Sequence, residues 1–217
     1  MASEPPPPYQ ARDSSTPAPI SASSHPATFH IECPKQRDYY IYSGPDKDTF
    51  INVQTNEWIS SDLAFYSSNA PTRELITCNF KETTCSVDKA DIKTQIGQKE
   101  TLWWAACIDP TIPISVQYRF KARVQNPANP FAGIAGVNAT SPRSFDWECH
   151  EGSEWRLVDE LTGAVAAVVR DVDFAAGVYG SIELLLSYGD TFSLIVFSSY
   201  LTICEKLKRE AKKHWIW

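Results

Sequence analysis

Strict alternation of apolar and polar residues is the clearest pattern in the chain, and it covers residues 114–124. The apolar positions are Ile114, Val116, Tyr118, Phe120, Ala122 and Val124, with a polar residue between each pair. Successive side chains of a β-strand point to opposite faces, so this pattern predicts a strand with one face in a core and the other in solvent. Three cations, Arg119, Lys121 and Arg123, fall on the solvent face.

Shorter segments of the chain predict further strands. Three of them alternate in the same way, at residues 50–54, 75–80 and 145–149. Five more are continuously apolar and bounded by turn residues, at residues 39–42, 102–108, 155–158, 164–170 and 182–187. Residues 126–142 predict an irregular surface loop. Close to ten strands without intervening helices favour an antiparallel barrel or sandwich over a parallel α/β sheet.

A helix is predicted at the end of the chain, over residues 190–213. Gly189, Asp190 and Thr191 offer an N-cap, and residues 192–204 are apolar or small on every side of the helix. A membrane span needs about 20 apolar residues, so this shorter segment favours a helix buried in the protein core. A tail anchor is the alternative, because basic residues and two tryptophans follow. From Glu205 the helix is mostly charged, which predicts an exposed second half.

Composition divides the chain into a tail and one domain. Residues 1–28 are rich in proline and serine and have almost nothing apolar to bury, which predicts a disordered tail. The chain has 217 residues and is 43% hydrophobic, which suits one substantial core, and we assign residues 29–217 to it. The start of the sequence lacks a secretory signal pattern, which predicts a cytoplasmic protein whose cysteines are free and buried.

Charge and motifs exclude several classes of function. A net charge of −6 argues against non-specific nucleic-acid binding, which needs a positively charged surface. The sequence contains no G-x-S-x-G, Walker, G-x-G-x-x-G or H-E-x-x-H motif. No nucleophile and base can be paired, and the histidines and cysteines have no metal-site spacing. We therefore expect a protein that is not an enzyme and has no cofactor or metal.

The tail contains one specific short motif. Pro6, Pro7, Pro8 and Tyr9 form the pattern P-P-x-Y, which is a ligand pattern for WW domains. Prolines favour the extended polyproline conformation already in the unbound peptide, so little conformational entropy is lost when it docks into an aromatic groove. The motif predicts a WW-domain partner, and a chance match in a proline-rich tail is the alternative.

The C-terminal third of the sequence resembles a known superfamily. The stretch SFDWECHEGSEWRLVDELTGAVAAVVRD is followed by an apolar strand and by FSLIVFSSYLTICEKLKREAKK. This order of a Trp147 strand, a W-x-L-V strand, a Thr162-Gly163 turn, a V-A-x-V strand and a final helix resembles uncharacterised fungal tubby C-terminal-like domains. Tubby-like proteins, phospholipid scramblases and LURP-one-related proteins belong to the same superfamily. The resemblance covers residue 144 onward, and residues 28–125 only by strand number.

The resemblance implies a fold and a function. The fold is mainly β, a closed antiparallel barrel of ten to twelve strands around a buried C-terminal helix. The function is binding of anionic phospholipid or phosphoinositide headgroups at the cytoplasmic face of a membrane, for which Arg119, Lys121 and Arg123 are the candidate contacts. Further interface contacts would be Lys206, Lys208, Arg209, Lys212, Lys213, Trp215 and Trp217. The alternatives are an ordinary solvated strand face, and an adaptor that works through its WW ligand without lipid.

Overall fold

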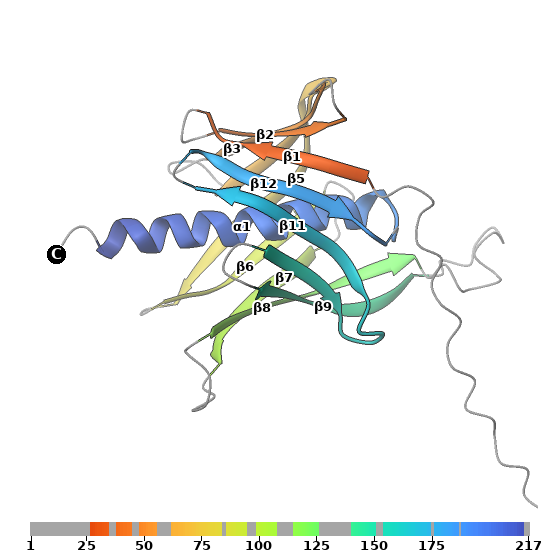
Figure 1. The fold of residues 1–217 in the computed structure, drawn as a ribbon, viewed down its shortest axis with the longest axis vertical. Helices are drawn as coiled ribbons and strands as arrows, with labels where there is room; N and C mark the ends of the chain where they lie inside the picture. Colours follow the sequence, from red (N-terminus) through yellow and green to blue (C-terminus); the bar gives the residue numbers. More distant parts are fainter. Residues whose placement is uncertain are drawn as a thin grey trace, which may run out of the picture.

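The protein is a closed barrel of antiparallel strands with one long helix running along its inside (Figure 1). The computed structural model describes residues 27–34, 38–44, 48–55, 62–83, 86–94, 99–107, 115–125, 140–150, 154–174, 176–186 and 188–214. The strands are β1 (Ala27–Glu32), β2 (Asp38–Ser43), β3 (Asp48–Thr55), β4 (Leu63–Ser67), β5 (Ala70–Thr83), β6 (Ser86–Thr94), β7 (Lys99–Cys107), β8 (Ser115–Gln125), β9 (Thr140–His150), β10 (Glu154–Asp159), β11 (Val165–Asp173) and β12 (Val178–Leu184). The helix is α1 (Asp190–His214).

Each strand of the barrel pairs with its neighbours in sequence, and β1 pairs with β12 to close the ring. The closing pair places Phe29 opposite Ile182. The predicted fold class is confirmed, with twelve strands at the upper end of the expected range. β1, β4 and β6 were not among the predicted strands. The first residues of β9 lie within the segment predicted as a loop.

Side chains of β8 follow the predicted alternation. Tyr118, Phe120, Ala122 and Val124 are buried in the barrel, and Lys121 and Arg123 are exposed on the outside, as the polar positions of the pattern predict. Neighbouring strands supply the same kind of inward face, so aromatic and branched side chains from the whole ring meet around α1. This core gives the barrel a filled interior.

The first half of α1 is buried, as predicted. Ile195, Phe197 and Tyr200 are 0% exposed. Polar groups of this half have partners inside the barrel: the Tyr200 hydroxyl donates to the carbonyl of Tyr179 at 2.9 Å, and Trp147 Nε1 donates to Ser199 Oγ at 2.9 Å. Within the described part of the chain, no helix is both long and apolar enough to pass through a bilayer.

The predicted boundary between the buried and exposed halves of α1 is wrong. Glu205 and Lys206 are each only 5% exposed. The barrel wall buries them because it offers polar partners, and the Tyr39 hydroxyl donates to Glu205 Oε2 at 2.9 Å. Lys206 Nζ lies 5.6 Å from the centre of the Tyr118 ring, within reach of a cation–π contact.

Free thiols were predicted at every cysteine, and the structure places none of the four cysteines whose side chains it describes, Cys33, Cys78, Cys149 and Cys204, in a disulfide. Burial was predicted as well, and Cys149 is an exception because it is exposed. It lies next to the last residue of β9, beyond the buried Trp147. Alternation therefore predicts on which face of the sheet a side chain lies. It does not predict how far along the barrel the side chain is, and so how deeply it is buried.

Candidate functional site

The three predicted cations of β8 lie in two different environments. Arg119 is opposite Asp146 in the register of β8 and β9. Its Nε donates to Asp146 Oδ1 at 2.6 Å and its Nη2 to Oδ2 at 2.7 Å. Glu160 lies 3.4 Å from the same guanidinium. Hydrogen bonding to Asp146 raises the pKa of Arg119, and the cation is already neutralised by this bidentate pair.

Lys121 and Arg123 have no such partner. Opposite them on β9 are Ser144 and Pro142, neither of which is acidic. Within the described ranges neither cation forms an ion pair, and both side chains are exposed. Alternate residues on one strand face are about 6 to 7 Å apart, so the two charges can contact neighbouring phosphates. The predicted three-cation patch is thus a pair of open cations beside a neutralised arginine.

The barrel wall near these cations has a short hairpin in it. Pairing of β6 with β5 ends where Thr94 meets Ile76, and pairing of β7 with β8 ends where Leu102 meets Phe120. Residues 70–75 of β5 and 121–125 of β8 extend beyond those pairs. On the side facing the hairpin they have no strand partner among the residues that the structure describes. We call residues 70–75, 93–94, 99–101 and 121–125 the open rim.

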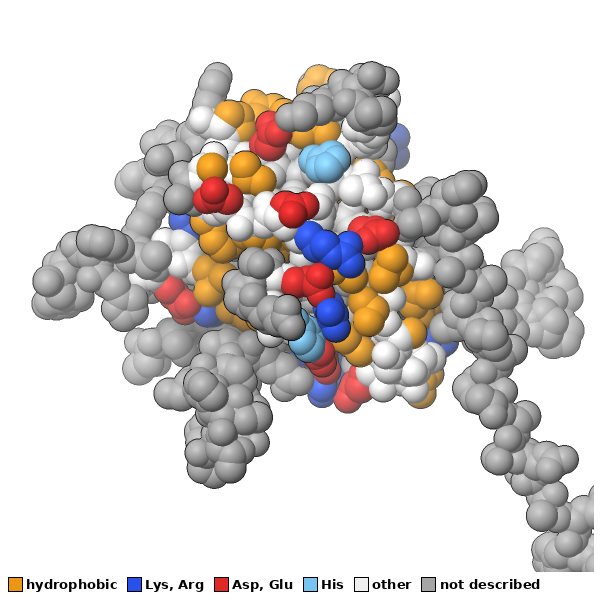
Figure 2. Space-filling model, viewed as in Figure 1, with side chains coloured by type: hydrophobic (Ala, Val, Ile, Leu, Met, Phe, Trp, Pro, Cys, Tyr) orange, Lys and Arg blue, Asp and Glu red, His pale blue; other side chains and the backbone are white. Residues whose placement is uncertain are grey.

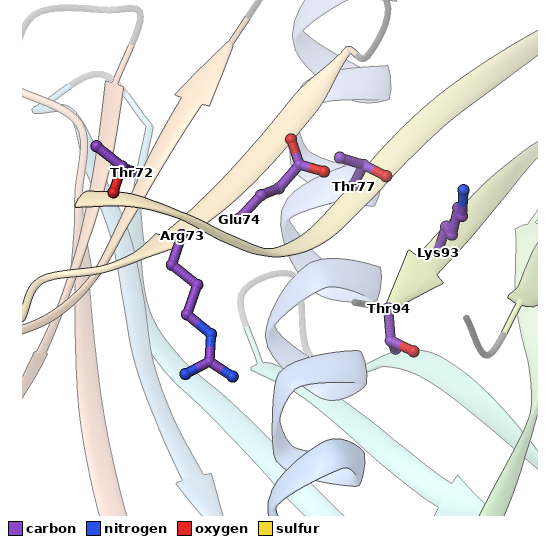
Figure 3. A pocket seen from close by; sticks show the side chains of 6 residues that line it. All are labelled: Thr72, Arg73, Glu74, Thr77, Lys93 and Thr94. Carbon is purple, nitrogen blue, oxygen red and sulfur yellow. The ribbon is translucent and has the colours of Figure 1, made fainter. Parts of the chain in front are cut away.

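A cavity of about 550 Å³ lies at the β5 side of the open rim. Its described lining is entirely polar: Thr72, Arg73, Glu74, Thr77, Lys93 and Thr94. A bulge between β4 and β5 next to Glu74 changes the alternation there. Figure 3 shows Arg73 pointing away from Glu74 and Thr77 on β5, with Lys93 and Thr94 on the neighbouring β6. Sequence reasoning missed this cavity, because residues 70–75 have no regular alternation and the bulge depends on β4.

The C-terminal basic cluster lies at the opposite end of the barrel. The open rim is at the end where α1 begins, because β8 ends and β5 begins there, and α1 runs away from it along the barrel (Figure 1). Lys208 follows Phe192 by 16 residues in the helix, which corresponds to a rise of about 24 Å. The sequence left open whether the two basic groups share a side, and the topology separates them.

Folding also neutralises the described cations of that cluster. Lys206 Nζ donates to Glu210 Oε1 at 2.7 Å, and Lys208 Nζ lies 3.6 Å from Glu205 Oε2. Arg209 donates to Asp62 Oδ1 at 2.9 Å and to Glu205 Oε1 at 3.2 Å. The pair of Arg209 with Asp62 attaches the helix to the barrel wall, and the other pairs are within the helix. Lys212, Lys213, Trp215 and Trp217 were predicted as interface contacts too, but those two lysine side chains and both tryptophans are outside the described part of the structure.

The face formed by β10, β11 and β12 carries charges of both signs (Figure 2). Arg170 Nη1 donates to Glu183 Oε2 at 2.6 Å, and its Nε donates to Glu154 Oε2 at 3.1 Å. Arg156 Nε donates to the other oxygen of Glu154 at 2.6 Å. Because each of these cations is already paired with a carboxylate, this face should bind an anion more weakly than Lys121 and Arg123 do.

A serine, a histidine and an aspartate also meet on the outer surface. The Ser181 hydroxyl donates to Asp171 Oδ2 at 3.3 Å, and His30 lies opposite Ser181 in the register of β1 and β12. Asp171 has a φ of 57°, and Gly180 lies so close to the Arg170 carbonyl that a Cβ on Gly180 would be 2.6 Å from the oxygen. A catalytic triad needs the histidine between the other two residues. No hydrogen bond in the described structure connects His30 to either.

No protein-family model matches the chain, and no curated protein sequence matches it significantly. The resemblance to tubby C-terminal-like domains therefore stays a prediction from the C-terminal sequence. The P-P-x-Y motif at Pro6, Pro7, Pro8 and Tyr9 is likewise a prediction, because it lies outside the described residues. Function has to be argued from the side chains of the barrel.

Proposed function

We propose that this domain is a non-enzymatic module that binds anionic phospholipid headgroups at a membrane surface. The observation that carries the proposal is the pair Lys121 and Arg123, which are exposed on adjacent outward positions of β8 and have no acidic partner in the described structure. The resemblance of the C-terminal sequence to a superfamily with lipid-binding members supports the same function. A cytoplasmic, peripheral location belongs to this proposal.

The filled barrel directs binding to the outside. Barrels that hold a ligand inside keep a cavity on their axis, whereas α1 occupies the axis here and buries Trp147 and Tyr200 against each other, with ring centres 5.6 Å apart. A ligand site must therefore be on the outer surface or at a rim. Lys93 at the polar cavity is at the same end of the barrel as Arg123, but on a different strand.

Two separated cations, Lys93 and Arg123, favour binding to a surface that carries many anions over binding to one small anion. Lys93 on β6 and Arg123 on β8 are two strand spacings apart, or about 10 Å. A layer of headgroups can contact both cations with different phosphates. Arg123 adds a planar fork that matches phosphate oxygens in a bidentate way, and Lys121 adds a point charge.

Vesicle flotation tests the proposal. The chain should float with phosphatidylcholine vesicles that contain a phosphoinositide and not with vesicles of phosphatidylcholine alone. Its binding should weaken as the salt concentration is raised. Each basic residue near an anionic membrane contributes about 1 kcal/mol. The double variant Lys121→Ala and Arg123→Ala should therefore bind about 30-fold more weakly, since 1.4 kcal/mol is tenfold.

The matched control for flotation is the double variant Arg156→Ala and Arg170→Ala. It removes the same charge from the face where the cations are already paired, and it should leave flotation within about twofold of the original chain. Equal loss in both double variants would show that only net charge matters. Absence of binding at low salt would refute headgroup binding altogether.

An adaptor role is the second function that the sequence predicts. A WW domain should capture the full chain from solution through Pro6, Pro7, Pro8 and Tyr9, and Tyr9→Ala should remove most of that binding, because the tyrosine fills a pocket beside the proline groove. Isothermal titration with a purified WW domain measures the change. Equal affinity of the Tyr9→Ala chain would exclude the motif as the ligand, whatever the barrel does with lipid.

A further inference from the structure

We propose that the turn between β10 and β11 inserts Leu161 at the boundary between headgroups and acyl chains of a membrane, while Lys121 and Arg123 contact the anionic headgroups. This inference rests on the proposed function and deepens it, because it adds an apolar contact and fixes which end of the barrel meets the bilayer. Three observations support it: the exposure of Leu161, the hydrogen bonds that hold the turn, and the position of the turn beside the two cations.

Leu161 has the most exposed large apolar side chain in the described part of the chain. It is 74% exposed, and among the described residues only Phe174, at 47%, is a further exposed side chain of this kind. Turns favour glycine, proline, asparagine, aspartate and serine, so the turn itself does not require a leucine. Single exposed leucines are common on protein surfaces, and the surroundings of this one therefore decide its meaning.

The turn that carries Leu161 is held by hydrogen bonds and anchored in the core. The Leu161 N–H donates to Asp159 Oδ1 at 3.0 Å, and the Gly163 N–H donates to the Asp159 carbonyl at 2.8 Å. The other carboxylate oxygen of Asp159 accepts from the Tyr188 hydroxyl and from Arg143. The leucine is thus presented in a defined position, so little conformational entropy is lost when it enters a membrane.

Strand register places this turn beside the two open cations, at the end of the barrel where α1 begins (Figure 1). Ser144 of β9 lies opposite Lys121 of β8, and the Ser144 carbonyl accepts from the N–H of Glu160 at 3.0 Å. Leu161 is the next residue. β8 and β10 are two strand spacings apart, or about 10 Å. One membrane surface can therefore contact Lys121, Arg123 and Leu161 together.

Charges next to the turn favour an anionic membrane surface. Glu160 is exposed, but it lies 3.4 Å from the guanidinium of Arg119, which also forms the bidentate pair with Asp146. These three groups leave one net negative charge, whereas Lys121 and Arg123 add two positive charges without a described acidic partner. An apolar side chain beside open cations matches a membrane interface, where anionic headgroups cover acyl chains.

A tryptophan placed in the turn tests insertion directly. The full chain with Leu161→Trp is mixed with phosphoinositide-containing vesicles whose phosphatidylcholine is brominated on its acyl chains. Bromine quenches indole fluorescence at short range, so Leu161→Trp should lose more fluorescence than the original chain does. The matched control is Phe174→Trp, because Phe174 is also exposed but follows β11 at the opposite end of the barrel. It should add no quenching.

Affinity and its salt dependence separate the leucine from the cations. Leu161→Ala removes apolar area without changing the charge, so it should weaken flotation about fivefold to tenfold. Its binding should keep the salt dependence of the original chain, whereas Lys121→Ala with Arg123→Ala should reduce that dependence. Thermal unfolding of each variant checks that the barrel stays folded.

The results distinguish failure of insertion from failure of headgroup binding. If the original chain floats, then equal quenching of Leu161→Trp and Phe174→Trp, or unchanged affinity of Leu161→Ala, would exclude insertion and leave headgroup binding by Lys121 and Arg123 intact. An original chain that does not float at low salt would refute both. Added quenching at position 161 together with weaker binding of Leu161→Ala would support insertion of the turn.

Discussion

Replacing Ile195 with aspartate is expected to abolish the folded domain. Ile195 is 0% exposed on the half of α1 that the barrel surrounds. An unpaired carboxylate at that position costs several kcal/mol after relaxation, and the lost apolar contacts add to it. Domains of this kind are stable by about 5 to 15 kcal/mol in total. Far-UV circular dichroism during thermal unfolding should show no cooperative transition for Ile195→Asp.

Leu161→Asp provides the matched control for that substitution. Leu161 is 74% exposed in the turn between β10 and β11, so the same chemical change there should alter stability by no more than about 0.5 kcal/mol. A cooperative transition retained in Ile195→Asp would contradict a core role for α1. It would restore the tail-anchor interpretation of the apolar segment.

Arg143→Met is expected to destabilise the domain by about 3 to 5 kcal/mol, the usual effect of breaking a buried ion pair from one side. Arg143 Nη1 donates to Asp159 Oδ2 at 2.5 Å, and the Tyr188 hydroxyl donates to the same oxygen at 2.8 Å. Asp159 is 0% exposed, so its charge would stay buried without a cation. Urea unfolding followed by tryptophan fluorescence measures the loss.

The double variant Arg143→Met and Asp159→Asn should recover at least half of that loss. The amide is neutral and can still accept from Tyr188, so no uncompensated charge remains. Arg143 Nε of the original chain is buried and has no hydrogen-bond partner among the described residues, and methionine removes that unsatisfied donor as well. Losses that simply add in the double variant would contradict direct coupling of the two side chains.

Lowering the pH should decrease the contribution of Asp159 to stability in the original chain and should relieve the destabilisation in Arg143→Met. Burial favours a higher pKa for Asp159, but hydrogen bonds from Tyr188 and Arg143 outweigh it, and the net pKa lies below its ordinary value. The stabilising contribution is therefore present at neutral pH and lost as pH falls below about 4. In Arg143→Met the carboxyl loses its cation and is easier to protonate. The stability gap between the chains should narrow from pH 7 to pH 4.

Local sequence patterns predicted most of the architecture. Period-two alternation in β8 placed Tyr118 inside and Lys121 outside because that rule depends only on strand geometry. The all-round apolar character of residues 192–204 predicted a surrounded helix, since such a helix has no face suited to water. β4 (Leu63–Ser67) and β6 were missed, and the apolar side chains of β6 are few.

The features that the sequence patterns did not predict depend on contacts between residues that are distant in sequence. Glu205 was expected in solvent because charged side chains usually are, yet Tyr39 and Arg209 make its burial possible. Arg119 was counted as an open cation because its partner Asp146 is set by the register of β9. The point at which β5 stops pairing with β6, at Ile76, is set by where β6 ends at Thr94. Contacts of this kind decide which charges remain available for a ligand.

Order of assembly follows from the position of α1 in the chain. The ring closes only when β1 meets β12, and the segment that fills it is made after both. Pairing of such remote segments makes folding slow. During synthesis the inward faces of the twelve preceding strands lack their central helix, which exposes them to wrong association. This architecture thus links correct folding in the cell to protection of the nascent barrel until residue 206 has left the ribosome.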